Sequence, residues 1–226
     1  MFSLNSLFGR KMTKLFDLCL LNILCLITCI PIITIGPSFT ALYTVMLAMS
    51  KDEEGPVSKM FFRAFKENFK KSTVAGLIYT AILAILILDI QIWQVSQTET
   101  KPLFVTATII LLVLAAMLGC WLFPLMAKFE NSVKNMFKNA LIFAFKYFPV
   151  SASMGIVIIG YTVLVLEYIF SVWFLFMIFG IVLLAYPWTF YVRIRFEKYL
   201  DDRGDAETIR ENIHGNCTDI QEDKQS

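Results

Sequence analysis

Four long, uninterrupted apolar blocks constrain the fold of this chain more than any other feature. They cover residues 73–95, 103–127, 150–166 and 172–192. At a rise of about 1.5 Å per residue, each forms a helix about as long as a bilayer hydrocarbon core is thick, roughly 30 Å. The hydrophobic content of 58% also exceeds the roughly 45 to 50% that soluble domains carry. The sequence therefore predicts an all-α, polytopic transmembrane helical bundle.

A further apolar region, residues 15–49, is too long for one span and is interrupted by the run PIITIGP at residues 31–37. Proline cannot continue the hydrogen-bond ladder inside a helix, so we expect a broken hairpin with legs at residues 15–30 and 38–49. The return leg is only about 18 Å long, which suits a tilted or re-entrant segment. PIITIGP is then either a turn between two helices or a functional broken helix.

The basic residues between the blocks predict the orientation, because cytoplasmic loops carry the excess of Lys and Arg. Residues 50–72 carry six, residues 128–148 four and residues 193–226 six, whereas residues 96–102 carry one and residues 167–171 none. We predict six membrane segments with both termini in the cytoplasm. Five spans with an external N-terminus are the alternative.

The chain divides into a transmembrane domain, residues 1–200, and a polar cytoplasmic tail, residues 201–226. Within the domain, FFRAFKENFKKS before the first long block is echoed by NALIFAFKYFPVS before the third. The echo suggests a repeated helix-pair unit over residues 15–95 and 103–192. A shared composition at the membrane edge is the other explanation.

Both echoed segments predict amphipathic helices at the cytoplasmic surface. In the first segment Phe61, Phe65 and Phe69 recur at four-residue spacing, with basic residues on other faces. Such a face suits an anionic lipid surface, which is the preferred interpretation, or a partner protein. The candidate residues of the first segment are Phe61, Phe62, Arg63, Phe65, Lys66, Asn68, Phe69 and Lys70.

Three polar residues within the apolar blocks or at their ends are candidates for an intramembrane site, because placing a charge there is costly. They are Asp89, Gln91 and Glu167. In a shared cavity, the two carboxylates would bind a cation, a proton or sugar hydroxyls. The alternative is that each carboxylate lies at the membrane interface and contacts water.

Tryptophans fall near the block ends, as is typical of an aromatic belt at the membrane interfaces. Trp93 and Trp173 lie at the expected outer ends, and Trp121 and Trp188 at the inner ends. We expect an interfacial role for them rather than ligand stacking.

Signatures of catalysis are absent from the sequence. Its single histidine, His214, lies in the polar tail, and no P-loop, GxSxG or HExxH motif occurs. Cys25 and Cys29 share a helix face, where a metal or redox pair is one interpretation and ordinary small buried residues the other. We predict no enzyme activity, no cofactor and no metal. The balance of 20 basic and 18 acidic residues also gives no indication of a nucleic-acid partner.

The run LLNILCLITCIPIITIGPSFTALYTVM, followed by KDEEG and FFRAFKENFKKS, resembles the YesL family of bacterial membrane proteins. The residues outside the amphipathic segment that carry the resemblance are Asn22, Pro31, Thr34, Gly36, Pro37 and Tyr43. The resemblance implies a multi-pass protein of the bacterial cell membrane with a part in carbohydrate uptake or its sensing. It implies sugar ABC transporter subunits or a sensor kinase as partners, besides the lipid bilayer, and supplies no catalytic residues.

Two functions are therefore expected. The preferred one is an accessory or regulatory component that contacts a transporter or sensor. The alternative is a small solute transporter or channel, with a path lined by PIITIGP and Asp89.

Overall fold

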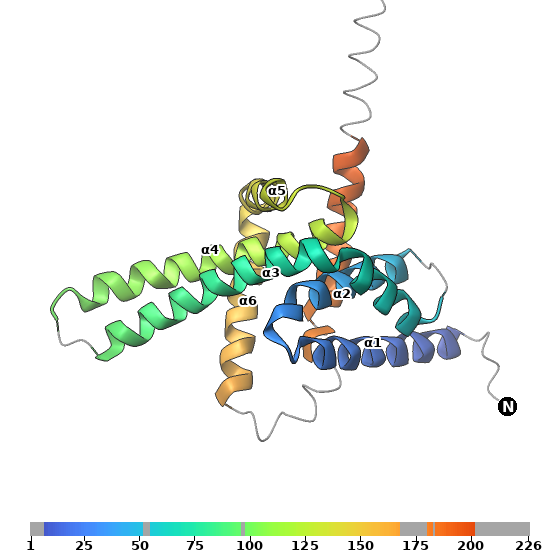
Figure 1. The fold of residues 1–226 in the computed structure, drawn as a ribbon, viewed down its shortest axis with the longest axis horizontal. Helices are drawn as coiled ribbons and strands as arrows, with labels where there is room; N and C mark the ends of the chain where they lie inside the picture. The colour runs from blue at the N-terminus through green and yellow to red at the C-terminus, as the bar shows by residue number, and fades with distance from the viewer. Residues whose placement is uncertain (1–6, 52–54, 96–97, 168–179, 183, 202–226) are drawn as a thin grey trace, which may run out of the picture.

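The computed structural model of the chain describes residues 7–51, 55–95, 98–167, 180–182 and 184–201 (Figure 1). Every regular element within these residues is a helix, which confirms the predicted all-α class. The helices in chain order are α1 (Leu7–Cys29), η1 (Ile32–Thr34), α2 (Ile35–Ser50), α3 (Val57–Val95), α4 (Lys101–Lys128), α5 (Val133–Lys146) and α6 (Phe148–Glu167). Residues 180–182 and 184–201 are also helical and are called the C-terminal helix.

Several of these helices are long and apolar enough to cross a membrane. In the described part of the chain four qualify, over Met12–Cys29, Ile32–Ser50, Val57–Trp93 and Lys101–Lys128. α5 and α6 qualify together, although the chain bends by 104° between them, as in a broken span or a re-entrant segment. The predicted polytopic bundle is thus confirmed. The first part of the expected 172–192 span lies outside the described residues.

The broken first hairpin is present as α1, η1 and α2. The break between α1 and α2 does not extend over all of PIITIGP, because Gly36 and Pro37 already belong to the first turn of α2. Proline is tolerated there, since the first turn of a helix has no intrahelical acceptors for its N–H groups. The Thr34 hydroxyl donates to the carbonyl oxygens of Thr28 (2.6 Å) and Pro31 (2.7 Å), which ties the connection back to α1.

The amphipathic segment before the 73–95 block is not a separate helix. α3 runs without interruption from Val57 to Val95, 39 residues, and so joins this segment to the span. Lys-Glu-Asn-Phe-Lys-Lys-Ser-Thr across the expected junction contains neither proline nor glycine, so nothing in the local sequence breaks the helix. α3 and α4 pack side by side as a long antiparallel pair (Figure 1).

The buried core lies near the start of α3 and the end of α4, with α2, α5 and the C-terminal helix around it. Trp121 and Trp188 are buried there, and their ring centroids are 5.3 Å apart. The Trp121 indole N–H donates to the Ser151 hydroxyl (2.8 Å), and that of Trp188 donates to the Cys120 carbonyl (2.8 Å). The expected interfacial role of these two tryptophans is therefore wrong, because tertiary packing encloses them.

The other pair of tryptophans has a different outcome. Trp93 is half-buried near the end of α3 and stacks on Phe104 of α4, with ring centroids 4.2 Å apart. Trp173 lies outside the described residues, as does the polar tail beyond Asp201.

Candidate functional site

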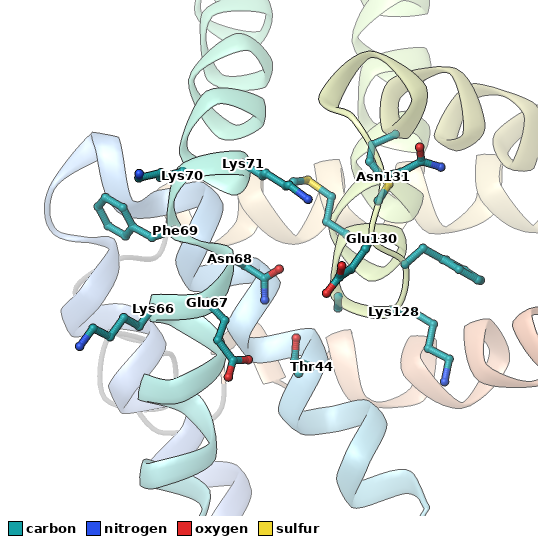
Figure 2. Close-up of a pocket in the computed structure, with 14 residues that line it drawn as sticks. Thr44, Lys66, Glu67, Asn68, Phe69, Lys70, Lys71, Lys128, Glu130 and Asn131 are labelled. Carbon is teal, nitrogen blue, oxygen red and sulfur yellow. The ribbon is translucent and has the colours of Figure 1, made fainter.

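A polar cavity of about 720 Å³ lies between α2, the first half of α3 and the connection from α4 to α5 (Figure 2). One wall is formed by consecutive residues of α3, Lys66 to Lys71. The opposite wall is formed by residues Met126 to Asn131. Thr44 and Met136 complete the lining. By the distribution of Lys and Arg, this is the end of the molecule expected in the cytoplasm.

Four oxygen-bearing side chains point toward the space between the two walls: Glu67, Asn68, Thr44 and Glu130 (Figure 2). Asn68 donates its amide N–H to the Ala64 carbonyl (3.0 Å), so its Oδ1 faces the cavity as an acceptor. Neither glutamate forms an ion pair within the described part of the chain. Both carboxylates are therefore available as hydrogen-bond acceptors.

Four lysines that line the cavity supply the opposite charge: Lys66, Lys70, Lys71 and Lys128. The Lys71 side chain extends from α3 across the top of the cavity toward the α4–α5 connection (Figure 2). A second, smaller cavity of about 210 Å³ adjoins the first and shares Thr44, Glu67 and Lys128 with it. Arg63 lines this smaller cavity. The site thus combines acceptor oxygens with basic groups around its rim.

The predicted amphipathic segment divides between two faces of α3. Phe61 is fully buried and stacks on Phe65 at 6.2 Å between ring centroids, so both belong to the packed face. Lys66, Phe69 and Lys70 point away from the inward side chains of the cavity (Figure 2).

These three side chains are exposed, as is Phe62 one turn before Lys66, and we call the four residues the outer stripe. The structure thus brings part of the predicted segment into the cavity and leaves a basic, aromatic face uncovered.

Asn22 is buried, with no exposed surface, and acts as a packing residue. Its side-chain oxygen accepts hydrogen bonds from the backbone N–H groups of Ile181 (3.0 Å) and Val182 (3.3 Å). These two hydrogen bonds join α1 to residues 181 and 182 of the C-terminal helix. Tyr43 is likewise buried in the core.

Gly36 marks the closest approach of α2 to α3. A Cβ atom added at Gly36 would lie 1.9 Å from the Ser72 carbonyl oxygen, and one added at Gly76 would lie 2.6 Å from the Gly36 Cα. Only a residue without a Cβ allows two helix backbones this near to each other. Gly36 and the neighbouring Pro37 therefore serve the packing of the first hairpin.

Asp89 accepts a hydrogen bond from the Thr108 hydroxyl at 2.5 Å, which links α3 to α4. Gln91 is exposed, and the side chain of Glu167 lies outside the described residues. Asp89 is thirteen residues beyond Gly76 on the same helix, or about 20 Å. The structure therefore does not bring Asp89 together with PIITIGP, which packs at Gly76.

The two predicted thiols are neighbours on α1, with 4.0 Å between the sulfur atoms of Cys25 and Cys29. Among the described residues, no three His, Cys, Asp or Glu side chains form a group that could hold a metal ion.

Sequence reasoning missed most of the cavity, since Thr44, Glu67, Lys71 and Glu130 were not among its candidates. A signal was present, because the pair Glu-Asn occurs at residues 67–68 and again at residues 130–131, once in each wall. Nothing local indicates that the two pairs meet, since about sixty residues separate them.

Comparison with known proteins identifies the relatives of this chain. Residues 18–90, from α1 through most of α3, match the family described as "Protein of unknown function, DUF624". Among curated proteins, "Uncharacterized protein YesL" of Bacillus subtilis (strain 168) is 26% identical over 134 residues, which are 59% of this chain and 63% of that protein. No solved structure matches the chain. The described helices and these matches, which cover part of the chain and part of its relative, support the assignment of the chain to the YesL family of membrane proteins.

Proposed function

We propose that this protein is an accessory or regulatory membrane component, without enzyme activity, linked to carbohydrate uptake or its sensing. It acts by binding a transporter subunit or a sensor kinase at its cytoplasmic end, in the cell membrane with both termini inside. The carbohydrate link comes from the family resemblance, and the mode of action from the geometry of α3.

The observation that supports docking is the unbroken length of α3. Its 39 residues extend over about 58 Å, whereas the hydrocarbon core is roughly 30 Å thick. If residues 73–95 span the core, Phe62 lies eleven residues, or about 16 Å, outside it along the helix. The headgroup layer on each side is only about 5 to 8 Å deep. A projecting helix of this kind cannot lie flat on the lipid surface.

The outer stripe therefore faces water unless a protein covers it. The side chain of Phe62 is 52% exposed and that of Phe69 is 38% exposed, with Lys66 between them. Aromatic and basic residues on one helix face are typical of a surface that buries apolar area against a partner carrying acidic groups. This favours a partner protein over the lipid surface as the ligand of the stripe.

The apolar part of the α3–α4 pair gives less support to a solute path. The Tyr79 hydroxyl fits against Gly119, where an added Cβ would lie 2.2 Å away, and it donates to the Ala115 carbonyl (3.2 Å). Asp89 is engaged by Thr108. The facing sides of the two helices are thus in contact with each other at these positions.

The test is an affinity pull-down of the tagged protein from mildly solubilised native membranes. The wild type is compared with the double variant Lys66→Glu/Lys70→Glu, which reverses the charge of the outer stripe. The matched control is Lys134→Glu/Lys138→Glu, which reverses two exposed lysines on α5. We expect sugar-transporter subunits or a sensor kinase with the wild type and the control, and their loss with the stripe variant. Recovery of the protein alone from wild-type membranes would contradict the proposal.

A further inference from the structure

We infer that the cavity between α3 and the α4–α5 connection binds a neutral, polyhydroxylated small molecule such as a monosaccharide or disaccharide. This inference rests on the proposed function, because a sugar bound on the expected cytoplasmic side would give a sensing component its signal. The cavity and the hydrogen-bonding groups that line it are features of the structure, whatever the function of the protein.

The size of the cavity suits one small ligand. Its volume of about 720 Å³ falls within the roughly 300 to 1,000 Å³ that is usual for small-molecule sites. Part of its lining is apolar, because Met126, Phe129 and Met136 are among the residues that line it. Such a lining fits the C–H faces of a sugar ring.

The polar groups of the cavity have mixed hydrogen-bonding character. The carboxylates of Glu67 and Glu130 accept only, as does the free side-chain oxygen of Asn68, whereas the Lys71 ammonium donates only. A sugar hydroxyl is one donor and two acceptors, so it satisfies both kinds of group. Several adjacent hydroxyls could therefore bridge the two walls.

The same mixture disfavours simple ions. An anion such as phosphate would approach the Glu67 and Glu130 carboxylates, which point into the space that it would occupy (Figure 2). A cation would meet Lys71 across the same space. A neutral ligand avoids both repulsions and retains the hydrogen bonds to charged groups, which are stronger than those between neutral groups.

The position of the cavity relates it to the docking surface. All of residues 68–71 contribute to the cavity wall, but the side chains of Asn68 and Lys71 point toward the cavity, whereas those of Phe69 and Lys70 point to the other side of the same helical turn (Figure 2). A ligand that bridges α3 and the α4–α5 connection would therefore restrain the turn that also carries the outer stripe.

The test measures binding by the purified full chain in nanodiscs, using calorimetry and ligand-dependent thermal unfolding. The probes are glucose, galactose, xylose, sucrose, maltose and mannitol, with glucose 6-phosphate and inorganic phosphate as anionic probes. We expect at least one neutral probe to bind and to raise the unfolding temperature as its concentration rises. Each of Glu67→Gln and Glu130→Gln should weaken binding about tenfold or more, because a hydrogen bond to a charged acceptor is stronger than one to a neutral acceptor.

The matched control is Lys134→Gln/Lys138→Gln, which changes two exposed lysines on α5 that do not line the cavity, and it should leave sugar binding unchanged. The inference is overturned if no neutral probe binds, if only the phosphate-bearing probes bind, or if both glutamine variants bind as the wild type does. None of these results bears on partner recovery by the outer stripe. Failure of the sugar site and failure of the docking function are thus separate outcomes.

Discussion

The two ends of the α3–α4 pair are built differently, although the same two helices form both. At the end near the connection of residues 96–100, large apolar side chains such as Ile85 and Ile110 are more than half exposed. At the other end Met117 and Leu122 are buried among side chains of neighbouring helices. The first end is thus made for lipid contact, and the second for protein contact.

The difference also concerns polar groups. The exposed end has the hydrogen bond between Asp89 and Thr108, whereas the packed end holds the cavity with its charged walls. A lipid-facing helix surface needs no exact complement, because acyl chains adapt to it. A packed surface needs specific shapes, and only there can a defined cavity persist. Variants at the two ends should therefore differ in effect.

The largest effect is expected at the crossing of α2 and α3. In Gly36→Leu the added side chain would begin 1.9 Å from the Ser72 carbonyl oxygen, so the helices must separate. We expect loss of monodisperse protein on size-exclusion chromatography in detergent. The control is Gly160→Leu on α6, where an added Cβ meets no atom within 4 Å. A monodisperse, thermally stable Gly36→Leu protein would contradict the close crossing.

The next effect concerns the aromatic core. Trp121 is fully buried and its indole N–H donates to the Ser151 hydroxyl, so Trp121→Ala leaves a large cavity and removes this hydrogen bond, while the Ser151 hydroxyl still donates to the Tyr147 carbonyl (2.9 Å). We expect the free energy of unfolding to fall by about 3 to 5 kcal/mol. Trp93→Ala, at the exposed end, removes one stacked ring pair with Phe104 and should cost about 0.5 to 1.5 kcal/mol. If chemical unfolding gave equal losses of free energy for Trp121→Ala and Trp93→Ala, the proposed difference between the two ends would be contradicted.

The sequence predicts the helical class and most spans, because the length of an apolar block can be compared directly with the thickness of the hydrocarbon core. The sequence misplaces the start of α3, because charged residues indicate where a segment leaves the membrane, whereas the helix itself can continue beyond that point. The echoed segments illustrate this point. The second contains Pro149 next to a 104° bend, while the first lies within an unbroken helix. Similar composition therefore does not imply similar backbone geometry.

The candidate site was harder to predict for a different reason. Asn68 was a candidate because it belongs to the short run of sequence that carries the family resemblance, which is a local signal. Glu130 depends on the approach of the α4–α5 connection to α3, and that contact is a property of the tertiary fold. The burial of Trp121 has the same origin, since its position near a block end is equally compatible with a membrane interface.

The smallest effect is expected from the polar tie at the exposed end. A double-mutant cycle of Asp89→Ala and Thr108→Val measures the coupling of the two side chains, which are joined by a 2.5 Å hydrogen bond. Interhelical hydrogen bonds in membranes contribute about 0.6 kcal/mol on average and up to about 1.7 kcal/mol. We expect a coupling in this range from unfolding in detergent.

Thr106→Val provides the control for this cycle, because Thr106 lies on the same helix and donates to the Pro102 carbonyl (2.7 Å) rather than to Asp89. Its coupling to Asp89 should be close to zero. If the cycle with Thr108 also gives no coupling, while Asp89→Asn changes solute flux in liposomes, then Asp89 lines a path instead of joining two helices. The exposed end would then take part in solute transport. The two ends could no longer be distinguished as one that only contacts lipid and one that holds the functional site.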